Sequence, residues 1–172
     1  MRTLLILGFT LFICLPSLNA QTKAEKKALK EEADLKGYEN IQSLIDSNSY
    51  EFEAAWATTQ GGKRINLIGN SGFLKVKDLK ANASLPYFGV AQSISYGGDG
   101  GIKFESDLKD YNVERVDKKK KLIIKGKTLN SRENFEIVLT VFQNGNASLF
   151  VSSLSRNGIS YDGKVKPISV KE

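Results

Sequence analysis

The chain has no histidine, and its only cysteine and only methionine, Cys14 and Met1, lie within residues 1–20. The rest of the chain therefore has no thiolate or imidazole to act as a nucleophile or general base, or to bind zinc or copper. This excludes the Ser-His-Asp and Cys-His mechanisms, and it excludes a disulfide in the remaining domain. What remains is carboxylate, lysine or tyrosine chemistry, an oxygen-ligand metal site, or binding without chemistry, and we expect no cofactor.

Residues 1–20 have the features of a secretory leader. Arg2 gives a positive start, and the apolar run at 4–15 is too short for a membrane span of about 20 residues. The segment 18–20, Leu-Asn-Ala, resembles a cleavage site. We therefore predict export to the periplasm or the extracellular space. Cys14 lies inside the apolar run after an isoleucine, which disfavours lipidation; an uncleaved anchor is the other alternative.

The net charge of +6 is basic but moderate, and the lysines are clustered. One cluster lies within residues 23–30. The other is the run Lys118, Lys119, Lys120 and Lys121, which predicts the tip of a hairpin. Such a run is typical of a solvated turn that discourages edge pairing; the alternative is contact with an anionic surface such as phospholipid or lipopolysaccharide. Nucleic acid is disfavoured, because the chain has an export leader and no recognised nucleic-acid-binding motif.

Residues 22–46 predict a single N-terminal helix. Thr22 is a suitable N-cap, and Glu25 three residues later completes a capping box. The first half is almost entirely charged residues and alanine, whereas the second half has apolar residues at helical spacing that we expect to dock on a sheet. These residues are Tyr38, Ile41, Leu44 and Ile45. We therefore divide the chain into the leader, a charged helical segment at 21–37 and a single β domain at 38–172.

Ten short stretches alternate apolar and polar residues, with glycine and asparagine between them, which is typical of antiparallel strands. The expected strands are at 50–58, 64–69, 74–76, 90–96, 102–105, 111–116, 121–125, 134–142, 147–151 and 159–165. Phe52, Ala54 and Trp56 are predicted to share one face of the first strand, and the uncharged stretch 81–89 is predicted to be a loop. Because no helix of crossover length separates the strands, the fold class is mainly β. We expect an antiparallel meander of about ten strands that forms a small closed barrel, with a β-sandwich as the alternative.

Six blocks follow one another along the β domain. They are FEAAWA at 52–57, GGKRINL at 61–67, NSGFLKV at 70–76, LPYFG at 85–89, YGGDGGIKF at 96–104 and ISYDG at 159–163. In this order they resemble a family known from secreted proteins of Bacteroidetes, catalogued as a domain of unknown function, number four-two-five-one. The resemblance covers residues 38–166. It implies a lipocalin-like barrel and an envelope or secreted location in a Gram-negative cell, and it implies no activity.

The stretch 81–89 is the first candidate for a binding site. It has no charged residue and includes Leu85, Tyr87 and Phe88, which is unusual for a loop in water. The structural interpretation is a fixed cap that completes the core at one end of the barrel. The functional interpretation is a rim that shields an apolar ligand or contacts a partner. Pro86 favours a fixed cap over a mobile flap.

Four further residues are candidates for ligand binding: Gly98, Asp99, Arg156 and Tyr161. Gly98 and Asp99 belong to a glycine-rich run that predicts a hairpin tip; the alternative is a backbone nest for an anion. Calcium is disfavoured there, because the spaced acidic residues of a calcium loop are absent. Arg156 and Tyr161 are expected first in a structural hydrogen-bond network and second in anion binding.

These observations favour an exported, non-catalytic binding module for a small apolar or amphipathic ligand or an envelope component. The alternative is an envelope structural or protein-interaction module with a basic surface. A carboxylate-dependent hydrolase is the weakest hypothesis, because we expect its acidic pairs to face water. Those pairs are Glu51 with Glu53 and Asp107 with Asp110. We assign no catalytic or metal-binding residue from the sequence.

Overall fold

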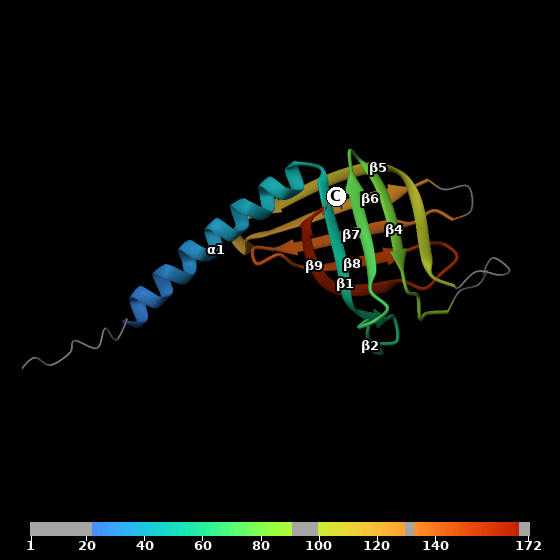
Figure 1. The fold of residues 1–172 in the computed structure, drawn as a ribbon, viewed down its shortest axis with the longest axis horizontal. Coiled ribbons are helices and arrows are strands. Elements are labelled where there is room, and N and C mark those ends of the chain that lie inside the picture. The colour runs from blue at the N-terminus through green and yellow to red at the C-terminus, as the bar shows by residue number, and fades with distance from the viewer. Residues whose placement is uncertain (1–21, 91–99, 130–132, 169–172) are drawn as a thin grey trace, which may run out of the picture.

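The computed structural model describes residues 22–90, 100–129 and 133–168 (Figure 1). This described part contains one α-helix, one short 3-10 helix and nine strands. The predicted leader lies outside the described residues, as do Gly98, Asp99 and all but the first residue of the predicted strand at 90–96.

The nine strands form one antiparallel sheet that closes into a barrel (Figure 1). In chain order they are β1 (Ser49–Thr59), β2 (Arg64–Asn66), β3 (Gly72–Lys77), β4 (Lys80–Leu85), β5 (Ile102–Val116), β6 (Lys121–Thr128), β7 (Glu136–Phe142), β8 (Asn146–Ser152) and β9 (Ile159–Pro167). From β3 to β9 each strand pairs with the next, and β1 pairs with both β3 and β9. Eight strands therefore close the barrel, and β2 is an extra strand beside the end of β1. The prediction of a closed antiparallel barrel is confirmed, and the sandwich alternative is discarded.

Helix α1 (Lys23–Asp46) begins with the predicted capping box. The Thr22 hydroxyl accepts a hydrogen bond from the Glu25 backbone N–H (3.2 Å), and the Glu25 carboxylate accepts one from the Thr22 N–H (2.8 Å). The first half of α1 extends away from the barrel as a charged arm (Figure 1). The buried residues of the helix are Tyr38, Ile41 and Ile45, all in the second half, as the apolar spacing predicts.

The second half of α1 lies against the barrel end that carries the β5–β6 and β7–β8 turns. The Tyr38 hydroxyl donates to Asp117 (2.9 Å), in the short 3-10 helix between β5 and β6. At Gly37 a Cβ would lie only 2.5 Å from the backbone oxygen of Gln143, after β7. Glycine is therefore required there by the close approach of the helix, and α1 continues through it without a break.

The uncharged stretch predicted as a loop is largely strand β4, so that prediction is wrong. Ala81, Ala83 and Leu85 are buried on the inner face, and Asn82 and Ser84 alternate with them. The stretch has the period of two that defines a strand. Its residues are mostly small on both faces, so the contrast in hydrophobicity that would reveal the strand is weak.

The predicted strands at 102–105 and 111–116 are two parts of the single strand β5. The pairing of β5 with β6 shifts between Lys109 and Asn112, and Asp110 has a positive φ of 52°. An irregularity of this kind interrupts the alternation of side chains. The sequence pattern therefore stops and restarts within one continuous strand.

A β-bulge in β1 changes the face of the sheet on which Trp56 lies. The register with β9 shifts between Ala54 and Trp56. Phe52 and Ala54 are buried as predicted, but Trp56 is 37% exposed and the next residue, Ala57, is buried. The prediction that Trp56 shares the inner face with Phe52 is therefore wrong. A bulge adds one residue to the strand and reverses the alternation beyond it.

Gly163 allows a close approach between the two strands that close the barrel. It is the Cα partner of Ala54, and a Cβ at this position would lie 1.9 Å from the backbone oxygen of Glu53. We predict that Gly163→Ala lowers the free energy of unfolding by about 2–3 kcal/mol, because β1 and β9 must separate to admit the methyl group. Urea denaturation followed by circular dichroism measures this change. The control is Gly61→Ala, whose Cβ would meet nothing nearer than 4.0 Å; equal stability of the two variants would contradict the prediction.

Candidate functional site

Predicted site residues at the barrel end opposite α1 hold one another in place. Tyr161, which is buried on β9, donates a hydrogen bond from its hydroxyl to the backbone oxygen of Pro86 (2.8 Å). The Tyr87 hydroxyl donates to the backbone oxygen of Asn157 (3.0 Å), in the β8–β9 connection. Leu85 is buried in the core. These two hydrogen bonds hold the segment after β4 as a fixed cap over this end of the barrel.

Arg156 joins several connections at the same end. Its Nε donates to the Glu133 carboxylate at 3.0 Å, and the two side chains are only 11% and 14% exposed. Its Nη1 donates to the backbone oxygen of Gly100 (2.6 Å), and its guanidinium lies 5.2 Å from the centre of the Tyr87 ring. These contacts form a structural hydrogen-bond network, which is the role that the sequence analysis preferred over anion binding for Arg156 and Tyr161.

The structure describes only one of the three remaining predicted site residues. Phe88 is exposed on the cap, whereas Gly98 and Asp99 lie outside the described residues. The structure brings Tyr87, Arg156 and Tyr161 together and uses their polar atoms within the protein. Ligand binding by the predicted set stays a prediction.

Two tyrosines of the core are much weaker acids than tyrosine in water. Burial raises the pKa of Tyr161 well above its ordinary value of about 10; Tyr87 adds to this effect and Arg156 opposes it. Burial also raises the pKa of Tyr50, whose hydroxyl lies 3.3 Å from that of Tyr111. Both core tyrosines are therefore neutral near pH 7, and neither acts as a general base there.

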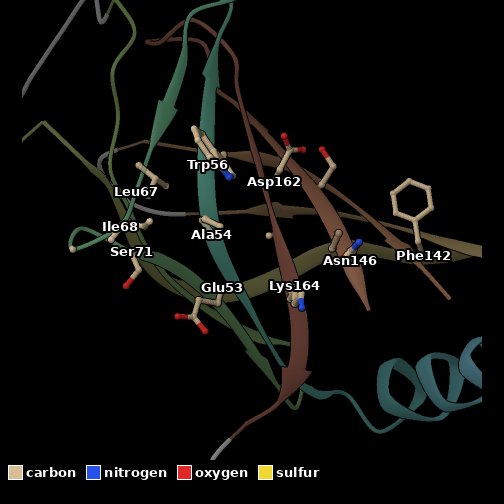
Figure 2. A pocket seen from close by; sticks show the side chains of 15 residues that line it. Glu53, Ala54, Trp56, Leu67, Ile68, Ser71, Phe142, Asn146, Asp162 and Lys164 are labelled. Carbon is tan, nitrogen blue, oxygen red and sulfur yellow. The ribbon is translucent and has the colours of Figure 1, made fainter. Parts of the chain in front are cut away.

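An open groove of about 660 Å³ lies on the outer face of the barrel, across β1, β9 and β8 (Figure 2). Its lining also includes residues of the connection between β2 and β3 and the last residue of β7. In Figure 2, Leu67 and Ile68 lie on one side of β1, and Phe142 lies on the far side of the groove. The groove therefore joins segments that are far apart in the chain.

Trp56 supplies the largest apolar side chain of this groove. Arg64 of β2 lies over its ring, 4.8 Å from the ring centre, and also pairs with Asp162 of β9 (3.4 Å). These two contacts hold the indole on the outer face. Ile68 is 88% exposed and Phe142 is 39% exposed, so the groove presents apolar surface to water from both sides.

The strands that form the groove carry small residues where they cross it. Ala55 of β1, Gly163 of β9 and Ser148 of β8 all line the groove, and none of the three is buried in the core. No large side chain from these positions fills the space between Ile68 and Phe142.

Two ion pairs and a further lysine surround the groove. Glu53 pairs with Lys166 (2.6 Å), and Asp162 pairs with Arg64 (3.4 Å). The hydrogen bond to Glu53 raises the pKa of Lys166. Lys164 lines the groove as well, and among the residues that the structure describes it has no ion-pair partner.

Two other open grooves lie on the barrel, of about 540 and 680 Å³. The first is lined by Phe150 and Asn157 and the second by Phe73 and Ile168, and neither includes the tryptophan. Within residues 22–90, 100–129 and 133–168, no three acidic side chains are grouped so that they could hold a metal ion. In the same ranges, no helix is both long and apolar enough to cross a membrane.

The sequence analysis missed the groove across β1, β9 and β8. The one signal for it was the chain's single tryptophan among the alanines 54, 55 and 57, where a strict period of two places the indole in the core. Only the bulge, which alternation does not reveal, turns Trp56 outward.

Comparisons with known proteins identify relatives of the chain. A family model described as "Domain of unknown function (DUF4251)" matches residues 32–165. The chain is also similar to a DUF4251 family protein from Bacteroides eggerthii DSM 20697, whose crystal structure has a resolution of 1.95 Å. The TM-score is 0.61 and the sequence identity is 18%, over 80% of this chain and 91% of that chain. Such low identity supports the fold alone. No curated protein matches the chain.

Tyr161→Phe tests the cap. At pH 7 the variant leaves the Pro86 oxygen without its donor, so we expect it to lower the free energy of unfolding by about 1–3 kcal/mol. Above about pH 10 the parent should lose stability as the pH rises, because Tyr161 ionises more readily in the unfolded chain than in the core. The variant lacks this contribution and should lose less stability over the same interval. Urea titrations across this pH range measure both effects, and equal alkaline losses in parent and variant would contradict the prediction.

Proposed function

This chain belongs to the DUF4251 family of domains of unknown function, and we propose that it is a non-catalytic binding module that holds a small amphipathic ligand in the groove across β1, β9 and β8. The proposal is carried by the exposure of Trp56 and Ile68 beside an open groove. Apolar surface of this kind is commonly covered by a ligand or partner. The sequence-based hypothesis placed the ligand at the end near Leu85, but the hydrogen bonds of the cap favour the outer groove.

The size and chemistry of the groove suit a small molecule. Its volume of about 660 Å³ falls within the range of roughly 300–1,000 Å³ that is usual for ligand sites. Its lining combines apolar side chains with a few polar groups, among them Ser148, Asp162 and Lys164. Such a mixture fits a ligand with an apolar body and a polar end.

The carboxylates of the hydrolase hypothesis support binding over catalysis. Glu51 lies 3.8 Å from the ammonium of Lys75, and Glu53 lies 2.6 Å from that of Lys166. Each carboxylate therefore already has a lysine of the protein as its partner. A hydrolase of this kind instead needs two acidic side chains that converge on the substrate, so these residues are poorly suited to that role.

Trp56 reports directly on the groove, because it is the only tryptophan of the chain. We expect octanol, an uncharged amphiphile, to shift the tryptophan emission to shorter wavelength as its chain covers the indole. Ser148→Phe fills the groove with a ring and should weaken this binding at least about tenfold, which corresponds to about 1.4 kcal/mol. Fluorescence titration measures both dissociation constants.

The matched control for this test is Ser84→Phe. Ser84, like Ser148, is half-buried on the outer face of a strand, but it lies on β4 and lines none of the three grooves. The control should bind octanol as the parent does. An unchanged emission in the parent, or equal affinities in the two variants, would remove the proposed site.

A second candidate function is attachment to an anionic surface. The ammonium of Lys120 donates to the backbone oxygen of Glu31 (3.5 Å), which brings the run 118–121 against the lysine-rich first half of α1. Two basic clusters that are separate in the sequence therefore lie near each other. Lysines next to an anionic bilayer each contribute about 1 kcal/mol of attraction.

Charge removal at the hairpin tip tests this second candidate. We expect replacement of Lys118, Lys119 and Lys121 by glutamine to weaken cosedimentation with phosphatidylglycerol vesicles at least about tenfold. The control removes the same charge elsewhere, by replacing three lysines that are exposed on β3, β4 and β5. They are Lys77, Lys80 and Lys109. An equal loss in both variants would show that net charge alone, rather than the hairpin tip, drives the attachment.

The proposal includes an exported location, periplasmic or extracellular. It rests on the leader features of residues 1–20, which lie outside the described residues. The charged first half of α1 would then separate the barrel from the cleavage site by an exposed helical arm.

A further inference from the structure

We infer that the occupant of this groove is a small anionic amphiphile whose carboxylate pairs with Lys164 while its hydrocarbon part lies against Trp56 and Ile68. The inference rests on the proposed function and adds the charge of the ligand and its direction in the groove. It follows from which charged groups around the groove already have partners.

The charges around the groove do not balance within the protein. Glu53 and Lys166 neutralise each other at 2.6 Å, and Asp162 and Arg64 do so at 3.4 Å. Lys164 remains, and its ammonium has no ion-pair partner in the described part of the chain. The groove therefore carries one uncompensated positive charge, which favours an anionic ligand.

The neighbours of Lys164 leave its ammonium available. Glu53 is its Cα partner on β1, but the Glu53 carboxylate pairs with Lys166 instead. On the other side, Asn146 of β8 is the Cα partner of Lys164, and Figure 2 shows both side chains at the same part of the groove. An amide beside an ammonium adds a neutral donor for an anionic oxygen.

The apolar and cationic parts of the groove are separate. Figure 2 places Lys164 on β9, whereas Ile68 lies across β1 from it and Trp56 lies further along β1. A ligand that meets both must have its charge at one end and its apolar part at the other. A cationic amphiphile would instead meet the unpaired ammonium, and a neutral one would leave that charge without a partner.

The test compares three molecules with the same eight-carbon chain and different heads: octanoate, octanol and octylamine. Tryptophan emission gives each dissociation constant at pH 8, where octanoate is ionised. We expect octanoate to bind the parent about fivefold more tightly than octanol, which is the size of effect of an exposed ion pair. Octylamine should bind more weakly than octanol.

Lys164→Gln should bring the affinity for octanoate down to that for octanol in the same variant. Lys164→Arg should keep the preference for octanoate. The matched control is Lys77→Gln, which removes one exposed positive charge from the outer face of β3, outside this groove. The control should keep the preference, and raised salt should reduce it in the parent.

The outcomes separate the two proposals. Equal binding of the three molecules to the parent, or an unchanged preference in Lys164→Gln, would overturn the anionic ligand while the groove still binds. An equal loss of preference in Lys77→Gln would assign the effect to net charge and would also overturn it. No emission change with any of the three molecules would remove the groove as a binding site, and this inference with it.

Discussion

The pairing of β1 with β9 is the contact on which the rest of the structure depends. It joins the two ends of the β domain, and it leaves the eight barrel strands without a free edge. The two backbones come so close that a side chain at Gly163 would clash with the backbone oxygen of Glu53. In the same stretch the bulge after Ala54 turns Trp56 outward. Barrel closure and the outward position of Trp56 thus both depend on the β1–β9 ladder.

The two ends of the barrel are closed by different means, which is why the proposed binding site lies on the wall. Apolar residues of α1 cover one end, and its hydrogen bond from Tyr38 to Asp117 adds a polar contact. At the other end Arg156 pairs with Glu133, and Tyr161 donates to the backbone oxygen of Pro86 in the cap. A ligand entering either end would have to break hydrogen bonds that are partly buried, which is costly. The outer groove is open without any such change.

The alternation of apolar and polar residues and the capping signals in the sequence were enough to predict the antiparallel barrel, the single helix and its capping box. They failed where the alternation itself changes: at the bulge before Trp56, at the irregularity around Asp110, and in β4, where small residues occupy both faces. The groove could not be predicted for a further reason. Its lining comes from β1, the β2–β3 connection, β7, β8 and β9, and only the sheet order brings these segments together. Among the described residues Lys164 has no ion-pair partner because Glu53 pairs with Lys166, and a sequence pattern does not specify with which lysine Glu53 pairs.

The groove has the rigidity that the proposed binding site would need in order to be selective. Its strands are held on both sides by ladder hydrogen bonds, and Trp56 is held by the Arg64 side chain, which is itself paired with Asp162. Ordering flexible side chains on binding costs about 0.5–1.5 kcal/mol each, and an indole that is already fixed avoids most of that cost. The same argument applies to Glu53, which Lys166 keeps away from Lys164. The proposed selectivity for an anionic head would then need no movement of the protein, because among the described residues the ion pairs leave the Lys164 ammonium without a partner.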